Sequence, residues 1–99
     1  MSRGFANVDS ARLGTVNNVA VATTSTAAAS SAFASTTFQI RVATSAVAFI
    51  KISDGTPTAA ATDSMMPANW VDYFIVSPGQ KISAFSPTIQ TISVTEITQ

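Results

Sequence analysis

The chain has 99 residues, of which 10% are charged and 46% are hydrophobic, and its five basic and five acidic residues give a formal net charge of zero. Soluble domains carry about 25% charged residues, and net charge helps to keep copies apart. The apolar fraction excludes a disordered chain, and the length predicts one domain with a small core. The shortage of charge favours a structural component whose surface is covered by copies of itself or by a larger body.

The chain contains neither cysteine nor histidine. This excludes disulfides and thiolate nucleophiles, and it removes the commonest general base. An activated serine or threonine would need Lys51, Lys81 or a carboxylate as its base, and neither a Ser-x-x-Lys spacing nor a Gly-x-Ser-x-Gly motif occurs. We therefore expect no catalytic residue, no metal, no cofactor and no enzymatic activity, and we expect synthesis in a reducing cytoplasm.

The first 14 residues are polar and show neither a helical nor a strand period. They predict an extended amino-terminal arm over residues 1–14, followed by a domain over residues 15–99. The arm offers three isolated apolar side chains and two basic ones as contacts: Phe5, Val8 and Leu13, with Arg3 and Arg12.

Residues 15–35 are rich in serine, threonine and alanine. Val19 to Ala22 could form a strand. The alanines that follow have helix propensity, but the flanking serine and threonine side chains compete for the backbone hydrogen bonds that a helix needs. This region is interpreted as a loop or an edge strand.

Strand signals dominate from residue 36 onward. Phe38, Ile40 and Val42 alternate with polar residues, which predicts one buried face. Residues 46–53 are apolar on both faces, as in an interior strand, and Asp54-Gly55 provides a turn after it. Residues 57–69 are interpreted as a loop.

The remaining sequence predicts three more strands. Residues 71–76 and 81–85 flank Ser77-Pro78-Gly79-Gln80, a type II turn sequence, and are expected to form a hairpin. Residues 89–97 form the last strand, in which a slip of the apolar parity indicates a bulge or twist. The whole pattern predicts an all-β fold: a small antiparallel β-sandwich or jelly-roll-like barrel, in which paired strands mostly follow one another in sequence.

Charged groups do not form a recognisable binding motif. Asp54 and Asp63 could hold calcium only as a loop site, because no EF-hand pattern occurs, and their turns explain both residues better. The basic residues are scattered, which argues against nucleic acid as a partner. No window has the length and apolarity of a membrane span.

A polar and aromatic cluster at residues 69–73 is the most distinctive surface feature. Trp70 and Tyr73, together with Asn69 and Asp72, could close the end of the core, anchor a protein interface or bind a sugar. The preceding Met65-Met66 pair is suited to a contact that adapts to its partner.

Several segments between residues 36 and 98 carry a family resemblance. They are Ile50–Thr58, Asp63–Asn69, Tyr73–Val76, Pro78–Ile82 and Ser93–Ile97. Together they resemble small virion proteins of tailed bacteriophages, over about two-thirds of the chain.

The resemblance implies a capsid decoration (cement) protein at the surface of the virion. Such a protein binds the outside of the head, bridges and stabilises subunits of the major capsid protein, and forms a homo-oligomer, here expected as a dimer or trimer. The interface would use the arm, the methionine pair and the two aromatic residues Trp70 and Tyr73. The alternative is a tail- or fibre-associated virion module that recognises a host-surface glycan through the residue 69–73 cluster.

Overall fold

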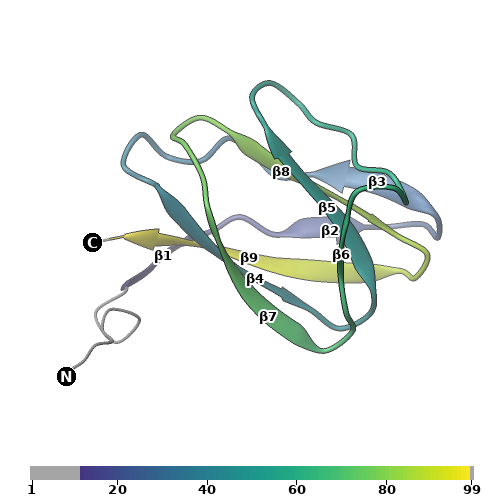
Figure 1. Cartoon of the computed structure of the whole chain (residues 1–99). Helices are drawn as coiled ribbons and strands as arrows, with labels where there is room; N and C mark the ends of the chain where they lie inside the picture. The colour runs from purple at the N-terminus through teal and green to yellow at the C-terminus, as the bar shows by residue number, and fades with distance from the viewer. Residues whose placement is uncertain (1–11, 99) are drawn as a thin grey trace.

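A computed structural model describes residues 12–98 of the chain. Over this range it contains nine strands and no helix, and the strands form two antiparallel sheets that pack face to face (Figure 1). This confirms the predicted all-β sandwich. The strands are β1 (Arg12–Val16), β2 (Val19–Val21), β3 (Thr26–Ala29), β4 (Gln39–Thr44), β5 (Ala48–Ser53), β6 (Ser64–Met66), β7 (Trp70–Ile75), β8 (Lys81–Ser86) and β9 (Gln90–Thr98).

The first sheet has the order β1-β9-β4-β7, and β2 also pairs with β9. The second sheet has the order β3-β8-β5-β6. The expected edge strands in residues 15–35 are present as β2 and β3. The expected loop over residues 57–69 is wrong in part, because β6 forms within it and pairs Met66 with Ala48 and Met65 with Phe49.

Pairing between sequence neighbours is rare, contrary to expectation. Only β5 and β6 are both consecutive and hydrogen-bonded within the described range, whereas most other connections carry the chain from one sheet to the other. The predicted hairpin over residues 71–85 is therefore wrong, since β7 and β8 lie in different sheets.

The type II turn that suggested this hairpin does form. Gly79 has a φ of 83°, and the Gln80 amide donates to the Ser77 carbonyl at 3.2 Å. Type II turns splay the flanking strands, unlike the turns that match the twist of a two-residue hairpin. The predicted turn at residues 77–80 is confirmed, and it connects β7 of the first sheet to β8 of the second.

β1 and β2 follow one another along the same edge of β9. The register of the pairing with β9 shifts between Leu13 and Val16, and then continues unchanged through β2. Between the two strands, the Asn17 amide donates to the Val94 carbonyl, and the Asn18 side chain accepts from the Val94 amide. The predicted irregularity near β9 exists, but its extra residue lies on β1.

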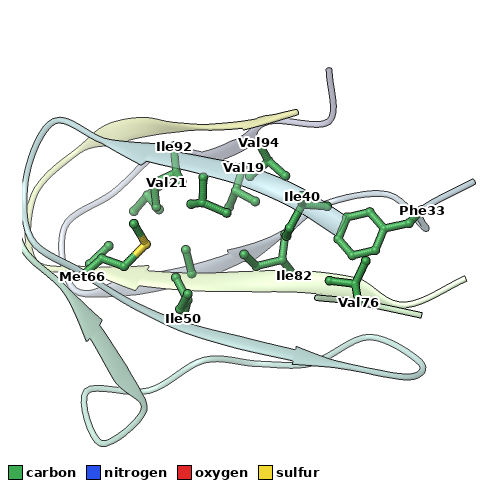
Figure 2. Packing of buried hydrophobic residues seen from close by; sticks show 13 residues of the cluster. Val19, Val21, Phe33, Ile40, Ile50, Met66, Val76, Ile82, Ile92 and Val94 are labelled. Carbon is green, nitrogen blue, oxygen red and sulfur yellow. The ribbon is translucent and has the colours of Figure 1, made fainter. Parts of the chain in front are cut away.

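The core fills the space between the sheets (Figure 2). Ile40 and Val42 are fully buried, as the alternation predicted. Phe38 is exposed, because regular pairing of β4 begins only at Gln39 and leaves this ring beyond the core. The buried apolar residues of the cluster are Val19, Val21, Phe33, Ile40, Val42, Ala48, Ile50, Met66, Val76, Ile82, Ala84, Ile92 and Val94.

Candidate interaction surface

The outer face of the first sheet follows from the alternation of its strands. Because Ile40 and Val42 point into the core, their neighbours Gln39, Arg41 and Ala43 point outward. The residues paired with these three share the outer face: Ile75, Tyr73 and Val71 on β7, and Ile97, Thr95 and Ser93 on β9. Leu13 pairs with Ile97, and Val16 with Thr95, so both extend this face onto β1.

This outer face is apolar at both of its margins. Its centre is formed by the half-buried Gln39, Arg41 and Ala43 of β4 together with the buried Thr95 and Ile97 of β9. Arg41 is the only charged side chain that β4, β7 and β9 place on this face. Large apolar side chains exposed to solvent are a mark of interaction surfaces when they gather on one face. The exposed fractions are 69% for Leu13, 62% for Val16, 43% for Val71, 38% for Tyr73 and 87% for Ile75.

The outer face of the second sheet is partly covered by the chain itself. Phe49 and Phe85 pack against each other on it, with ring centroids 6.2 Å apart, and both are half-buried. The long connection from β5 to β6, residues 54–63, lies over β8 (Figure 1). The Ala59 amide donates to Ser83 Oγ at 2.9 Å, and this hydroxyl donates to the Ala28 carbonyl.

A shallow hollow lies where the residue 54–63 connection meets β3. Its volume is about 180 Å³, and its lining consists of Ala27, Ala28, Ala29, Thr56, Pro57, Thr58 and Ser83. No ionisable side chain lines it. Catalysis by acid, base or nucleophile needs such a group or an activated hydroxyl, and Ser83 is already committed to the two backbone groups that it joins.

Glu96 is buried at one end of the sandwich, where it organises the backbone. Its Oε1 accepts hydrogen bonds from the Ala34 amide at 3.0 Å and from the Thr37 hydroxyl at 2.5 Å. Its Oε2 lies 3.4 Å from Asn17 Nδ2, and Asn17 in turn exchanges hydrogen bonds with the Ser31 backbone. The carboxylate thus joins β9 to the β1–β2 junction and to the segment between β3 and β4.

Gln90 has a comparable role at the other end of β9. Its Oε1 accepts from the amides of Ser45 and Ala46, and its Nε2 donates to the Ala46 carbonyl and to Ser86 Oγ. A buried side-chain amide that is saturated in this way fixes the β4–β5 connection against the start of β9. The burial of Glu96 and Gln90 is therefore explained by a structural role, since each side chain holds backbone segments in place through its hydrogen bonds.

The structure separates the residues of the expected 69–73 cluster. In the pairing of β7 with β4, Trp70 and Asp72 lie on one face of the strand and Tyr73 lies on the other. Trp70 is half-exposed and does not close the core. Asp72 Oδ1 accepts a hydrogen bond from the Tyr73 amide at 2.9 Å. The four side chains therefore do not form one sugar-binding surface.

The methionine pair is also divided between two environments. Met66 is 3% exposed and belongs to the core, so the interpretation of Met66 as an interface residue is wrong. Met65 lies on the outer face of the second sheet and is 59% exposed. Adjacent residues of a strand point to opposite faces, so a continuous pair could not serve a single contact.

Of the arm residues, Leu13 lies within β1 and is exposed on the outer face of the first sheet. Arg12 begins the same strand, so regular structure starts inside the expected arm. The expected contacts Arg3, Phe5 and Val8 lie outside the described residues.

The acidic residues Asp54 and Asp63 lie in turns. Gly55, next to Asp54, has the positive φ of 72° expected of its turn. Asp63 Oδ2 accepts a hydrogen bond from the Ala60 amide at 2.7 Å, which closes a local turn. Among residues 12–98, no three histidine, cysteine or acidic side chains gather in a way that could hold a metal ion. Nor does this part of the chain contain a helix long and apolar enough to cross a membrane.

Comparisons of the chain with protein-family models, with curated proteins and with solved structures find no match. Function is therefore inferred from the exposed surface.

The exposed residues Val16, Val71 and Ile75 are not among the contact residues that the sequence predicts. A signal for the last two was present, since residues 70–75 are mostly apolar at both parities. In a two-layer sandwich only the inner face of each sheet is covered by the other sheet, so such a strand turns its second apolar face outward.

Proposed function

We propose that the chain is a bacteriophage capsid decoration (cement) protein. It binds the outer surface of the head, bridges neighbouring subunits of the major capsid protein and stabilises the shell. The observation that carries the proposal is the outer face of the first sheet, which exposes Leu13, Val16, Val71, Tyr73 and Ile75 around a nearly uncharged centre.

The chemistry of this face supports a protein partner. Burial of apolar area stabilises a contact by about 25 cal/mol per Å² before the costs of association. A weak contact of this kind becomes firm when many linked copies bind the same shell. The zero net charge of the chain suits a crowded lattice, because copies do not repel one another over long range.

The resemblance of residues 36–98 to small virion proteins supports the phage setting. The segments that carry it include β5 with its Asp54-Gly55 turn, and the β7–β8 connection around Gly79. Each is a strand or a turn, as expected of a structural protein.

The proposal is tested by counting the copies of this chain per virion. Virions of the phage that encodes it would be purified, and the molar ratio of this chain to the major capsid protein would be measured by quantitative mass spectrometry. A decoration protein is present in a fixed ratio to the capsid lattice. Heads that lack the chain should lose their contents at a lower temperature, and added purified protein should restore their resistance.

Absence of the chain from purified virions would contradict any virion role. A few copies per particle, lost together with tails, would contradict decoration and support the tail- or fibre-associated alternative. In that case the Trp70→Ala variant should lose binding to host cells, because Trp70 is the exposed aromatic side chain that a glycan would stack on.

A further inference from the structure

We propose that two copies of this chain pair through the free edges of β7, antiparallel about a twofold axis at Tyr73. The proposed dimer joins the first sheets of the two copies into one continuous sheet. It does not depend on the proposed function, since no capsid takes part in it.

The hydrogen-bond pattern shows which groups of β7 are free. The Val76 amide donates to the Phe38 carbonyl at 3.0 Å, in the same register that pairs Phe74 with Ile40 and Asp72 with Val42. In an antiparallel ladder, alternate residues bond to the same neighbour. The backbone groups of Val71, Tyr73 and Ile75 therefore point away from β4, toward the open edge.

Three other edges in the described part of the chain are interrupted or short. β1 and β2 are separated by a bulge and by the asparagine pair, β3 has four residues, and β6 has three and is followed by Pro67. β7 has six residues without proline, lysine or bulge. Natural proteins protect long apolar edges with such devices or with inward-pointing charges. Asp72 is the one charge on β7, so this edge is the least protected of the four described edges and is suited to pairing with another strand.

The edge of β7 is complementary to itself in one register. When Tyr73 lies opposite Tyr73 of the second copy, Val71 lies opposite Ile75, so every outward-facing backbone group finds a partner. The outer face then pairs tyrosine with tyrosine and valine with isoleucine, which are favourable cross-strand pairs. On the inner face Asp72 lies opposite Phe74, so the two carboxylates are not opposed.

A shift of one residue shows why this register is favoured. Tyr73 would then face an Asp72 position, the outward groups would no longer be aligned, and side chains would change faces. A shift of two in one direction places Asp72 directly opposite Asp72, and like charges in this position destabilise a pair. A shift of two in the other direction places Val71 opposite Ser77, beyond the end of β7, so fewer residues of the strand are paired. In the free chain the Asp72 side chain occupies the Tyr73 amide, so dimer formation exchanges this bond for one to the second copy.

The oligomeric state of the purified full-length chain tests the pairing. Sedimentation equilibrium should give twice the chain mass of 10.2 kDa. The Ile75→Lys variant should give the mass of one chain, because it places lysine at the edge opposite Val71. The Ile89→Lys variant is the matched control: Ile89 is also exposed, at 62%, but it lies outside β7, and this variant should remain dimeric.

Single cysteines test the register, since the chain has none of its own. Opposed residues of a hydrogen-bonded antiparallel pair lie about 5.5 Å apart at Cα, within the range of a disulfide. Tyr73→Cys should therefore form covalent dimers on oxidation, and Val71→Cys, which faces residue 75, should not. A monomeric or trimeric wild-type chain, a dimeric Ile75→Lys variant, or cross-linking of Val71→Cys in place of Tyr73→Cys would each overturn the proposal.

Discussion

The outer faces of the two sheets are formed in the same way but differ in how far the chain covers them. Both arise from the alternation of antiparallel strands, and both carry large apolar side chains: Phe49 and Phe85 on the second sheet, Tyr73 and Ile75 on the first. The second face is partly covered by residues 54–63, whereas no described connection covers the β7 side of the first. A single long connection thus covers part of one sheet surface, and the β7 side of the other surface stays exposed.

The largest effect on the first sheet is expected from Glu96→Ala. The substitution leaves the Ala34 amide and the Thr37 hydroxyl without their buried acceptor and releases Asn17 at the β1–β2 junction. Unsatisfied buried polar groups cost about 1–3 kcal/mol each, so we expect a loss of about 3 kcal/mol in the free energy of unfolding. Urea denaturation measures it.

Glu96→Gln serves as the control for this substitution. It retains an acceptor oxygen for the Ala34 amide and the Thr37 hydroxyl and loses only the acceptor of Asn17 Nδ2, so it should lose less than half as much stability. Equal losses in the two variants would show that the charge of Glu96, rather than its acceptor geometry, holds β1 against the sheet.

Particle binding should depend on the first face and not on the second. Val16→Lys and Met65→Lys change side chains of similar exposure, 62% and 59%, on the first and second faces respectively. Lysine in place of the exposed Val16 should weaken binding by about 30-fold, which corresponds to about 2 kcal/mol. Binding to heads that lack the chain, measured by co-sedimentation, should remain unchanged for Met65→Lys. A stronger effect of Met65→Lys would reverse the assignment of the two faces.

The cover of the second sheet should loosen in Ser83→Ala. This hydroxyl joins the Ala59 amide to the Ala28 carbonyl, and its loss should cost about 1–2 kcal/mol. Hydrogen exchange should quicken at the amides of residues 58–60 before it changes in β4 or β9. Unchanged exchange at Ala59 would mean that packing alone holds the connection in place.

The smallest effect is expected from Lys51→Ala. Lys51 is exposed on the second sheet, and surface substitutions of this kind usually change stability by less than about 0.5 kcal/mol. A thermal denaturation midpoint shifted well beyond this range would show that Lys51 contacts the cover of its sheet.

Part of the candidate surface could be predicted from the sequence. Leu13 and Tyr73 were expected as contact residues because they are large apolar or aromatic side chains in polar surroundings, and both lie on the outer face of the first sheet. The prediction that Met66 is a contact residue was wrong, because its position in β6 directs its side chain into the core. Which of the two methionines points inward depends on the register of β6, which the sequence does not show. Trp70 and Tyr73 were assigned to one cluster because they are close in the sequence. In a strand, residues an odd number of positions apart point to opposite faces, so the two side chains are separated.

The sequence by itself determined the class of the fold and the place of its turns. Alternation of apolar residues identified β4, the apolar run identified β5, and glycine chemistry located the turns at Gly55 and Gly79. These are local properties, since side-chain period and the sign of φ depend on a few adjacent residues. Only the tertiary structure decided which strands pair, that Glu96 is buried, and which outer face is covered. Those features depend on contacts between residues far apart in the chain, such as Glu96 with Ala34 or Ala59 with Ser83, and no local pattern encodes them.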